Sequence, residues 1–399
     1  MDAPLGVGLI GFGYIGKVHA YGYRTMPLFY DPLPVPTRLV GVATSRPETA
    51  RRAAEQGGFA FGTADWRELI DRRDIHIIDI CSPNHLHLEQ ILAAIAAGKH
   101  IYCDKPLVVT AEEAARVEEA LAGYQGIGQM TLQYRFYPAT LRARELVEEG
   151  FLGDLIGLRG AYLHSGSVDP ERPMGWKQLA SAGGGVLRDL GSHILDLVDH
   201  LVGPFAEVQA ETRVLYPERP LAGGERVPVE AEDQVLLWLR APNGALGSLE
   251  ASKIATGTED ELRFELHGDR GALRFNLMAP NYLEAYDLRA PDAPHGGRRG
   301  WQRIDTVQRY DGASILPSPK ASIGWLFCRP SLPNPQGLTR RTASLAILLQ
   351  NIRIRVTLAP ITIVAVLLIM PDDSAALGAA ACCVSSAIGA NWKGLGGKR

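Results

Sequence analysis

A glycine-rich turn between a strand and a helix restricts the fold of this chain more than any other feature. The mostly apolar run LGVGLI (5–10) is followed by GFGYIG, after which KVHAYGYR has the spacing of a helix. In such a unit Gly11 permits the tight turn, Gly13 lets backbone amides approach a pyrophosphate, and Gly16 lets helix and strand pack closely. Three spaced glycines alone are a weak signal, and a turn without a ligand is the alternative. The surrounding strand and helix favour dinucleotide binding.

Strands and helices alternate through the first 125 residues. Segments 38–44 (RLVGVAT) and 75–82 (IHIIDICS) are predicted strands, and the second is apolar enough to be buried on both faces of a parallel sheet. Helices are predicted at PETARRAAEQ and LHLEQILAAIAAG. The proline-rich segment 26–36 is expected to be a loop insertion, because proline has no amide donor and cannot continue a helix. This order predicts an α/β Rossmann domain with a doubly wound parallel sheet over residues 1–125.

The pattern changes from about residue 128. A helix at 139–150 and a glycine-rich turn at 181–185 come first, then a further helix. Alternating strands such as VEAEDQVLLWLR, ALGSLEASKI and ELRFELHG follow, joined by short turns. Alternation of this kind is typical of an antiparallel sheet with one solvated face. We expect a second, α+β domain over 126–325 with an open, mostly antiparallel sheet, whose free face would suit an oligomer interface.

Composition excludes several classes of function. Forty-one basic against 44 acidic residues leave a net charge of -3, without the basic excess of a nucleic-acid-binding protein. The five cysteines lack zinc-ligand spacing, so we expect no metal site, no disulfide framework and a reducing compartment. The N-terminus lacks the basic region of a signal peptide. The apolar run 356–370 is too short to cross a membrane. A cytoplasmic protein with neither nucleic acid nor membrane as partner is expected.

The tip of the second predicted strand bears on the cofactor. A carboxylate at this position would bind the ribose hydroxyls of NAD and repel a 2′-phosphate. The chain instead has Thr44, Ser45 and Arg46, of which the last two can donate hydrogen bonds to a phosphate. This favours NADP over NAD. The alternative is that Arg46 faces solvent while NAD binds through the other contacts.

Three further motifs support a family assignment. They are SPNHLH (82–87), CDKP (103–106) and GGGVLRDLGSHILD (183–196). With the glycine turn, their order and spacing resemble the Gfo/Idh/MocA family of nicotinamide-dependent dehydrogenases over about residues 5–315. Asp104 replaces the Glu of the family's EKP turn, and Ser82 replaces its usual Thr. The stretches MPLFYDP, TADWRELI and YLHSGSVDPERPMGWK are most similar to the branch of the family that contains levoglucosan dehydrogenase.

The resemblance implies a mechanism that the residues themselves can support. Oxidation of an alcohol needs a base, a group that stabilises the alkoxide, and a carbon held over the nicotinamide. Asp189 and His193 are four residues apart, so on a helix they share one face. Lys105 precedes Pro106, which restricts the backbone that aims the lysine. In the family the matching His is the acid/base, the Lys hydrogen-bonds the reacting hydroxyl, and the Asp holds substrate and His in place.

The implied activity is hydride transfer between a secondary hydroxyl of a sugar, anhydrosugar or cyclitol and NADP or NAD. Two alternatives stay open: a non-catalytic regulator that senses the dinucleotide, and an NAD-dependent glycosidase that oxidises its substrate only transiently. A regulator should have lost the catalytic Lys or His, and this chain keeps both. A homodimer or homotetramer is expected.

The candidate residues fall into two groups. Those expected to contact the cofactor are Gly11, Gly13, Tyr14, Ile15, Gly16, Thr44, Ser45, Arg46, Ser82, Pro83, Asn84, His87, Asp104 and Lys105. Those expected to contact the substrate are Lys105, Tyr134, Arg135, Trp176, Lys177, Asp189 and His193. For Asn84 the alternative is a helix cap, and for Tyr134, Arg135, Trp176 and Lys177 it is a structural role. Asp196, which also matches the family motif, is expected to be structural.

The C-terminal segment departs from the family. Residues 326–399 are poor in acids, rich in Ala and Ile, and hold three of the five cysteines. We interpret this tail as the product of a frameshift or of strong divergence.

Overall fold

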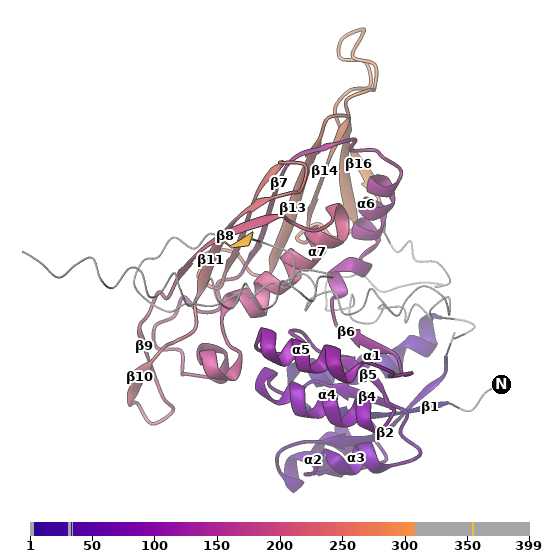
Figure 1. Cartoon of the computed structure of the whole chain (residues 1–399), viewed down its shortest axis with the longest axis vertical. Coiled ribbons are helices and arrows are strands. Elements are labelled where there is room, and N and C mark those ends of the chain that lie inside the picture. Colours follow the sequence, from indigo (N-terminus) through magenta and orange to yellow (C-terminus); the bar gives the residue numbers. More distant parts are fainter. Residues whose placement is uncertain (1–3, 31–32, 34, 308–352, 355–399) are drawn as a thin grey trace, which may run out of the picture.

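The first sheet has six parallel strands. The computed structural model describes residues 4–30, 33, 35–307 and 353–354. The strands are β1 (Leu5–Ile10), β2 (Thr37–Ala43), β3 (Phe61–Thr63), β4 (Ile77–Ile80), β5 (His100–Cys103) and β6 (Gly128–Met130), in the order β3-β2-β1-β4-β5-β6. Every adjacent pair is parallel. The predicted Rossmann fold is confirmed, and it occupies the lower half of the molecule in Figure 1.

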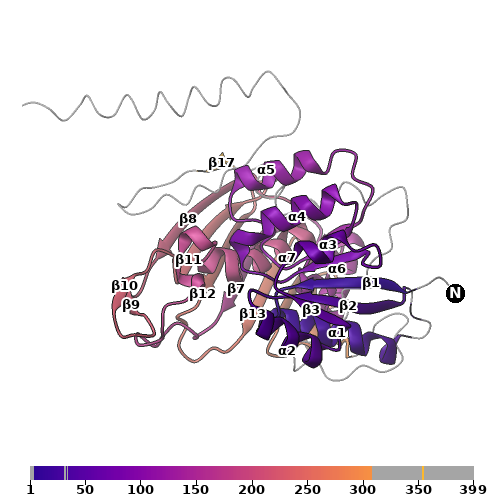
Figure 2. The same ribbon diagram turned by 90° about the horizontal axis from the view of Figure 1, so that it is seen from below.

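Helices cover both faces of this sheet. They are α1 (Tyr14–Phe29), α2 (Pro47–Gly57), α3 (Arg67–Asp71), α4 (His87–Ala96) and α5 (Ala111–Ala120). Figure 2 shows helices on both sides of the sheet. Leu9 packs with residues of α1 and α2, whereas its neighbour Ile10 packs with residues of α3, α4 and α5, so the two side chains point to opposite faces. Ile78 and Ile80 of β4 are fully buried. This explains the almost continuous apolar run of that strand.

Two boundaries differ from the sequence prediction. Helix α1 continues through Pro27 to Phe29, although the segment from residue 26 was predicted to be a loop. A proline in the last turn removes one backbone hydrogen bond only, and Tyr30 still donates to the carbonyl of Met26 at 3.2 Å. The first sheet also extends beyond residue 125, because β6 pairs with β5. Strand β6 is only three residues long, which gives it little periodicity to detect.

The second sheet is mixed but mostly antiparallel, as expected. Its strands are β7 (Leu155–Leu163), β8 (Glu207–Arg213), β11 (Gln234–Arg240), β12 (Leu246–Ser252), β13 (Glu261–Gly268), β14 (Gly271–Asn276), β15 (Tyr282–Asp287), β16 (Trp301–Asp305) and β17 (Arg353–Ile354). The order is β16-β15-β14-β13-β7-β12-β11-β8-β17, with β12–β7 and β17–β8 parallel. A separate two-stranded ribbon joins β9 (Glu218–Pro220) and β10 (Arg226–Pro228).

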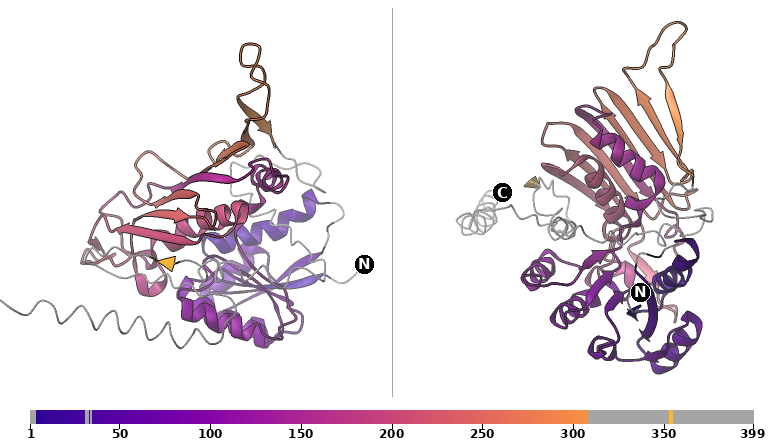
Figure 3. Two further views of the ribbon diagram at one scale, coloured as in Figure 1. Left: turned by 45° about the horizontal axis from the view of Figure 1, so that its top comes forward. Right: turned by 90° about the vertical axis from the view of Figure 1, so that its right-hand side faces the viewer.

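One face of this sheet is covered by helices α6 (Pro138–Glu148) and α7 (Ser192–Val202) (Figure 3). Along β11, Leu237 and Leu239 are buried beneath them, whereas Trp238 between them is exposed on the opposite face. No helix among the described residues is long and apolar enough to cross a membrane. Apart from β17, the interpretation of residues 326–399 concerns a segment outside the described residues.

Candidate active site

The glycine turn follows β1 directly, and two of its glycines are required by the backbone around them. Gly11 has φ +92°, and a Cβ there would lie 2.5 Å from the carbonyl oxygen of Cys81. A Cβ on Gly16 would lie 2.0 Å from the carbonyl oxygen of Gly11. A Cβ on Gly13 would meet nothing within 4 Å. The turn therefore leaves open space at Gly13, which fits the close approach of a dinucleotide pyrophosphate at the N-terminus of α1.

Substitutions at Gly11 and Gly13 should separate folding from cofactor binding. Gly11→Ala places a side chain at positive φ against Cys81 and should cost about 1–3 kcal/mol of folding free energy. Gly13→Val fits the extended backbone of that residue and should leave the melting temperature within about 2 °C, while it weakens dinucleotide binding at least about tenfold. Thermal melts and fluorescence titration with NADH measure both effects. Unchanged NADH affinity in Gly13→Val would contradict the assignment of this turn.

The residues that follow β2 differ in whether their side chains already have partners within the protein. The Thr44 hydroxyl donates to the carbonyl of Arg46 at 3.1 Å and lies 2.6 Å from the Thr49 hydroxyl, so it is engaged locally. Ser45 and Arg46 are exposed, and Arg46 precedes the first turn of α2. Within the described part of the chain, no carboxylate forms an ion pair with Arg46. Arg46 is thus available to a ligand bound beside β2.

The turn after β4 is tied to the rest of the protein by its polar side chains. Asn84 donates from its amide to the carbonyl of Gly183 at 2.8 Å and makes no helix-capping bond, so the alternative of a helix cap is not observed. His87 is fully buried, and its ring nitrogens lie 2.8 Å from the Ser82 carbonyl and 3.0 Å from the Pro106 carbonyl. Ser82 donates through its hydroxyl to Gln90. Asn84 and His87 therefore hold the motifs together, and a contact of either residue with the cofactor stays a prediction.

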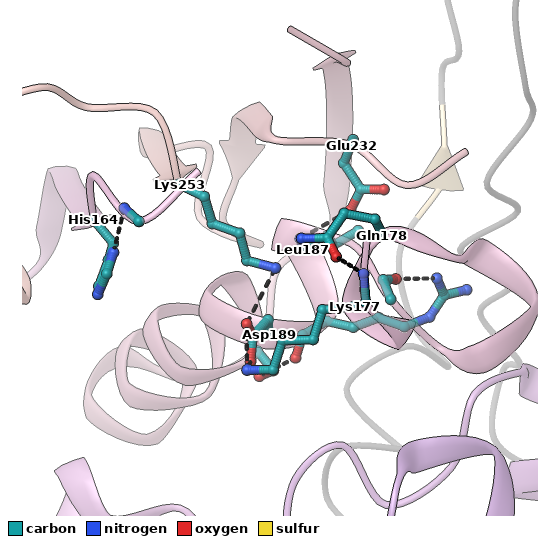
Figure 4. A network of polar contacts seen from close by, with 12 residues as sticks. His164, Lys177, Gln178, Leu187, Asp189, Glu232 and Lys253 are labelled. Atoms are coloured by element: carbon teal, nitrogen blue, oxygen red, sulfur yellow. Dashed lines mark hydrogen bonds and ion pairs between the residues drawn. The ribbon is translucent and has the colours of Figure 1, made fainter. Parts of the chain in front are cut away.

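Lys105 and Asp189 join the two halves of the molecule. Lys105 lies two residues after β5, and Asp189 lies on a short π-helical turn, Leu187–Gly191, that leads into α7. The Lys105 ammonium donates to Asp189 Oδ1 at 2.9 Å and also to the Asp189 backbone carbonyl. The backbone amide of Leu187 donates to Glu232 at 2.9 Å, which fixes this turn (Figure 4).

Three ammonium groups surround the Asp189 carboxylate. Besides Lys105, Lys177 approaches to 2.9 Å and Lys253 to 3.1 Å, both at Oδ2. Burial alone would raise the pKa of Asp189, but the three lysines lower it well below its ordinary value. Asp189 is thus a permanent carboxylate at the boundary between the two sheets.

His193 lies one turn after Asp189, in the first turn of α7. It is buried, and its Nδ1 atom has no hydrogen-bond partner within the described residues. The ring of Tyr134 packs edge to face against it, with ring centroids 4.9 Å apart. Burial, and next the charge of Lys105, lower the pKa of His193 well below its usual value of 6.5. The imidazole is therefore neutral at neutral pH, which is the state that a proton acceptor needs.

This low pKa predicts the pH dependence of the reaction. The folded protein keeps His193 unprotonated below pH 6.5, whereas the unfolded chain takes up the proton near 6.5. The free energy of folding that this group contributes is therefore complete above 6.5 and is lost as pH falls toward the folded pKa. His193 should stay unprotonated between pH 8 and pH 6. We therefore expect that its titration causes no decrease in kcat/KM for alcohol oxidation over this range, as measured by initial rates. A decline centred near 6.5 would contradict the assignment.

The other predicted substrate residues divide into two sets. Arg135 is held by two hydrogen bonds to the buried Asp196, one of them 2.7 Å long, so it has a structural partner, and its contact with the substrate stays a prediction. Asp196 is structural, as expected. Trp176 is half-buried and Lys177 is half-exposed at the same site.

The sequence analysis missed two residues of the site. Lys253 follows β12, within a predicted strand where a lone lysine gave no signal. Tyr162 bonds the Tyr134 hydroxyl at 2.7 Å and also donates to Asp260 at 2.7 Å. Asp104, predicted to lie at the cofactor, is partly buried, and its Oδ1 atom has no partner among the described residues.

The fold and this site define a two-domain nicotinamide-dependent oxidoreductase, and comparisons with known proteins agree. The family model for the oxidoreductase family with an NAD-binding Rossmann fold matches residues 5–131, and the GFO/IDH/MocA C-terminal domain model matches residues 140–274. The chain therefore belongs to the Gfo/Idh/MocA family.

Individual relatives are sugar and cyclitol dehydrogenases. Levoglucosan dehydrogenase of Pseudarthrobacter phenanthrenivorans is 39% identical over 337 residues, which are 80% of this chain and 85% of the relative. Myo-inositol 2-dehydrogenase of Thermotoga maritima is 27% identical and covers 67% and 74%. The solved complex of levoglucosan dehydrogenase with NADH and levoglucosan has a TM-score of 0.76 at 37% identity, covering 81% of this chain and 86% of the other. Levoglucosan dehydrogenase binds NADH in its solved complexes, so the predicted preference for NADP has no support from them.

Proposed function

We propose that this chain is an NAD(P)-dependent dehydrogenase that acts on a secondary hydroxyl of a sugar, anhydrosugar or cyclitol. The observation that carries the proposal is the convergence of Lys105, from the first domain, with Asp189 and His193, from the second domain. Relatives named for levoglucosan, myo-inositol and D-glucoside oxidation support the class of substrate.

The three side chains have distinct tasks in this reaction. His193 is neutral and accepts the proton of the reacting hydroxyl. Lys105 carries a positive charge and donates a hydrogen bond to the oxygen on which negative charge develops. Asp189 holds the Lys105 ammonium in place at 2.9 Å. A bound nicotinamide would supply the hydride acceptor. In the reverse direction the protonated His193 returns the proton to the oxygen.

Two residues suit the recognition of a polyol. Trp176 offers an aromatic face on which a sugar ring can stack, and Lys177 offers an ammonium for its hydroxyls. Both lie on the short turn Trp176–Gln178 beside Asp189, and the Lys177 ammonium is 5.7 Å from the centre of the Trp176 ring.

The test is an activity screen on purified protein with NAD or NADP. Levoglucosan, myo-inositol, D-glucose, D-xylose and a methyl glucoside are offered in turn, and reduced nicotinamide and products are measured. Oxidised sugar with equimolar reduced cofactor supports the proposal. Released monosaccharide without net reduction would identify a glycosidase. A clear thermal shift with dinucleotide but no turnover of any of these compounds would favour a regulator.

The cofactor preference can be decided at Arg46. If the guanidinium binds a 2′-phosphate, Arg46→Ala should weaken NADPH binding about tenfold and leave NADH binding within about twofold. Equilibrium binding of the two cofactors to both proteins measures this. Equal effects on the affinities for NADH and NADPH, or no effect on either, would show that Arg46 does not bind the 2′-phosphate.

Assembly and compartment complete the proposal. We expect a homodimer or homotetramer in the cytoplasm, and the exposed face of the second sheet, which includes Trp238, is the candidate interface. Analytical ultracentrifugation of the purified chain tests the assembly.

A further inference from the structure

Lys253 is a buried ammonium that the proposed reaction does not yet use. It directly follows β12, and its side chain is 10% exposed. Its backbone is held on both sides, because its amide donates to the carbonyl of Asp233 at 2.8 Å and its carbonyl accepts from the amide of Ser167 at 2.9 Å. Burying an ammonium is costly unless it is paired. The partner within 4 Å is the Asp189 carboxylate, at 3.1 Å.

The contacts of Asp189 are divided between its two oxygens. Lys105 binds Oδ1. Lys253 instead binds Oδ2, as Figure 4 shows. Lys177 contacts both oxygens, at 3.0 and 2.9 Å, but its side chain is 48% exposed. An ion pair open to water is weaker and less restrictive than a buried one. Lys253 is therefore the solvent-shielded ion-pair partner of Oδ2, and Lys105 is the solvent-shielded partner of Oδ1.

We propose that Lys253 is a positioning residue whose ammonium fixes the Oδ2 oxygen of Asp189, so that the carboxylate keeps one orientation toward Lys105 and the reacting hydroxyl. This inference rests on the proposed dehydrogenase function. Lys253 acts through Asp189. Lys253 directly follows the end of strand β12, whereas Lys177 extends from the short turn Trp176–Gln178.

The charged groups around this pair determine what its loss should do. Lys105, Lys177 and Lys253 all face Asp189, and Asp233 lies near Lys253 on its other side. Replacing Lys253 removes one of three positive charges at Asp189, so the pKa of that carboxyl should rise. The carboxylate should also gain rotational freedom about its own axis.

The first experiment compares Lys253→Met with Lys253→Arg in sugar oxidation. Methionine fills the space without the charge, and we expect kcat to fall about 10- to 100-fold with KM within about threefold. The acid limb of kcat/KM should move up by about one pH unit. Arginine keeps the charge and should restore most of kcat. The matched control is Lys99→Met, which removes a partly buried ammonium bound to the carbonyls of Arg72 and Ile75, far from the site, and should leave kcat unchanged.

A second measurement decides the inference even if the unmodified protein oxidises no sugar. The carboxyl carbon of Asp189, labelled with carbon-13 and assigned with Asp189→Asn, is titrated by NMR in the unmodified protein and in Lys253→Met. A higher pKa in the variant supports the positioning role, whatever the activity. An unchanged Asp189 pKa overturns it, as does a normal kcat and pH profile in Lys253→Met. Inactivity of the unmodified protein with an altered Asp189 titration would instead count against the proposed function alone.

Discussion

His193→Asn should lower kcat for sugar oxidation about 1,000-fold, the largest single effect we expect. The asparagine amide cannot accept the hydroxyl proton, whereas the neutral imidazole can. Binding of the dinucleotide should be unchanged within about twofold, because His193 lies on α7 of the second domain and the glycine turn lies in the first. Steady-state kinetics with the sugar that gives the highest rate, together with NADH titration, measures both quantities.

A matched control lies on the same helix. His200 is also partly buried on α7, and burial lowers its pKa to about 3, but it makes no contact with Asp189 or Lys105 among the described residues. His200→Asn should therefore keep kcat within about threefold. Equal losses in the two variants would mean that α7 has been perturbed and that His193 has no special role.

Lys105→Met should lower kcat/KM about 100- to 1,000-fold. The ammonium that would stabilise the alkoxide is lost, and Asp189 loses its partner at Oδ1. The charge of Lys105 also helps to keep the pKa of His193 low, so this pKa should rise in the variant. The residual activity should then decline at a higher pH than in the unmodified protein. The pH profile of kcat/KM is the measurement.

The pattern of loss distinguishes catalysis from folding. Lys105→Met removes a charge from between the domains, so its melting temperature is compared with that of Lys99→Met. Lys105→Arg keeps the positive charge but places it on a longer, planar group. Its kcat/KM should therefore exceed that of Lys105→Met by less than about tenfold. Full activity in Lys105→Met at any pH would remove Lys105 from the mechanism.

Much of the fold was predictable because it rests on local patterns. Gly11 has a positive φ, Gly16 packs against the carbonyl of Gly11 five residues earlier, and the apolar run of β4 reflects burial on both faces. The errors arose where local rules are weak. Pro27 is tolerated in the last turn of α1, and β6 is too short to show a period.

The site was predictable only in part. Asp189 and His193 lie one turn apart, and sequence spacing alone brings them together. Arg135 was placed in the sugar pocket, but its pairing with Asp196 depends on two helical segments that are 61 residues apart in the chain. The contact between Asn84 and Gly183 links residues 99 apart. No periodicity carries such information, because these contacts form only when segments far apart in the chain pack together.

The sequence by itself determined the Rossmann half and the mostly antiparallel second sheet, and it singled out Lys105, Asp189 and His193 as candidates for the proposed reaction. Those features depend on local conformational limits, on the period of apolar side chains and on motif spacing. Only the tertiary structure decided which charges meet. It brought Lys177 and Lys253 to Asp189, enclosed His193 against Tyr134, and committed Arg135, Asn84 and His87 to structural contacts. Electrostatic energies depend on distance and burial, and both exist only once the chain has folded.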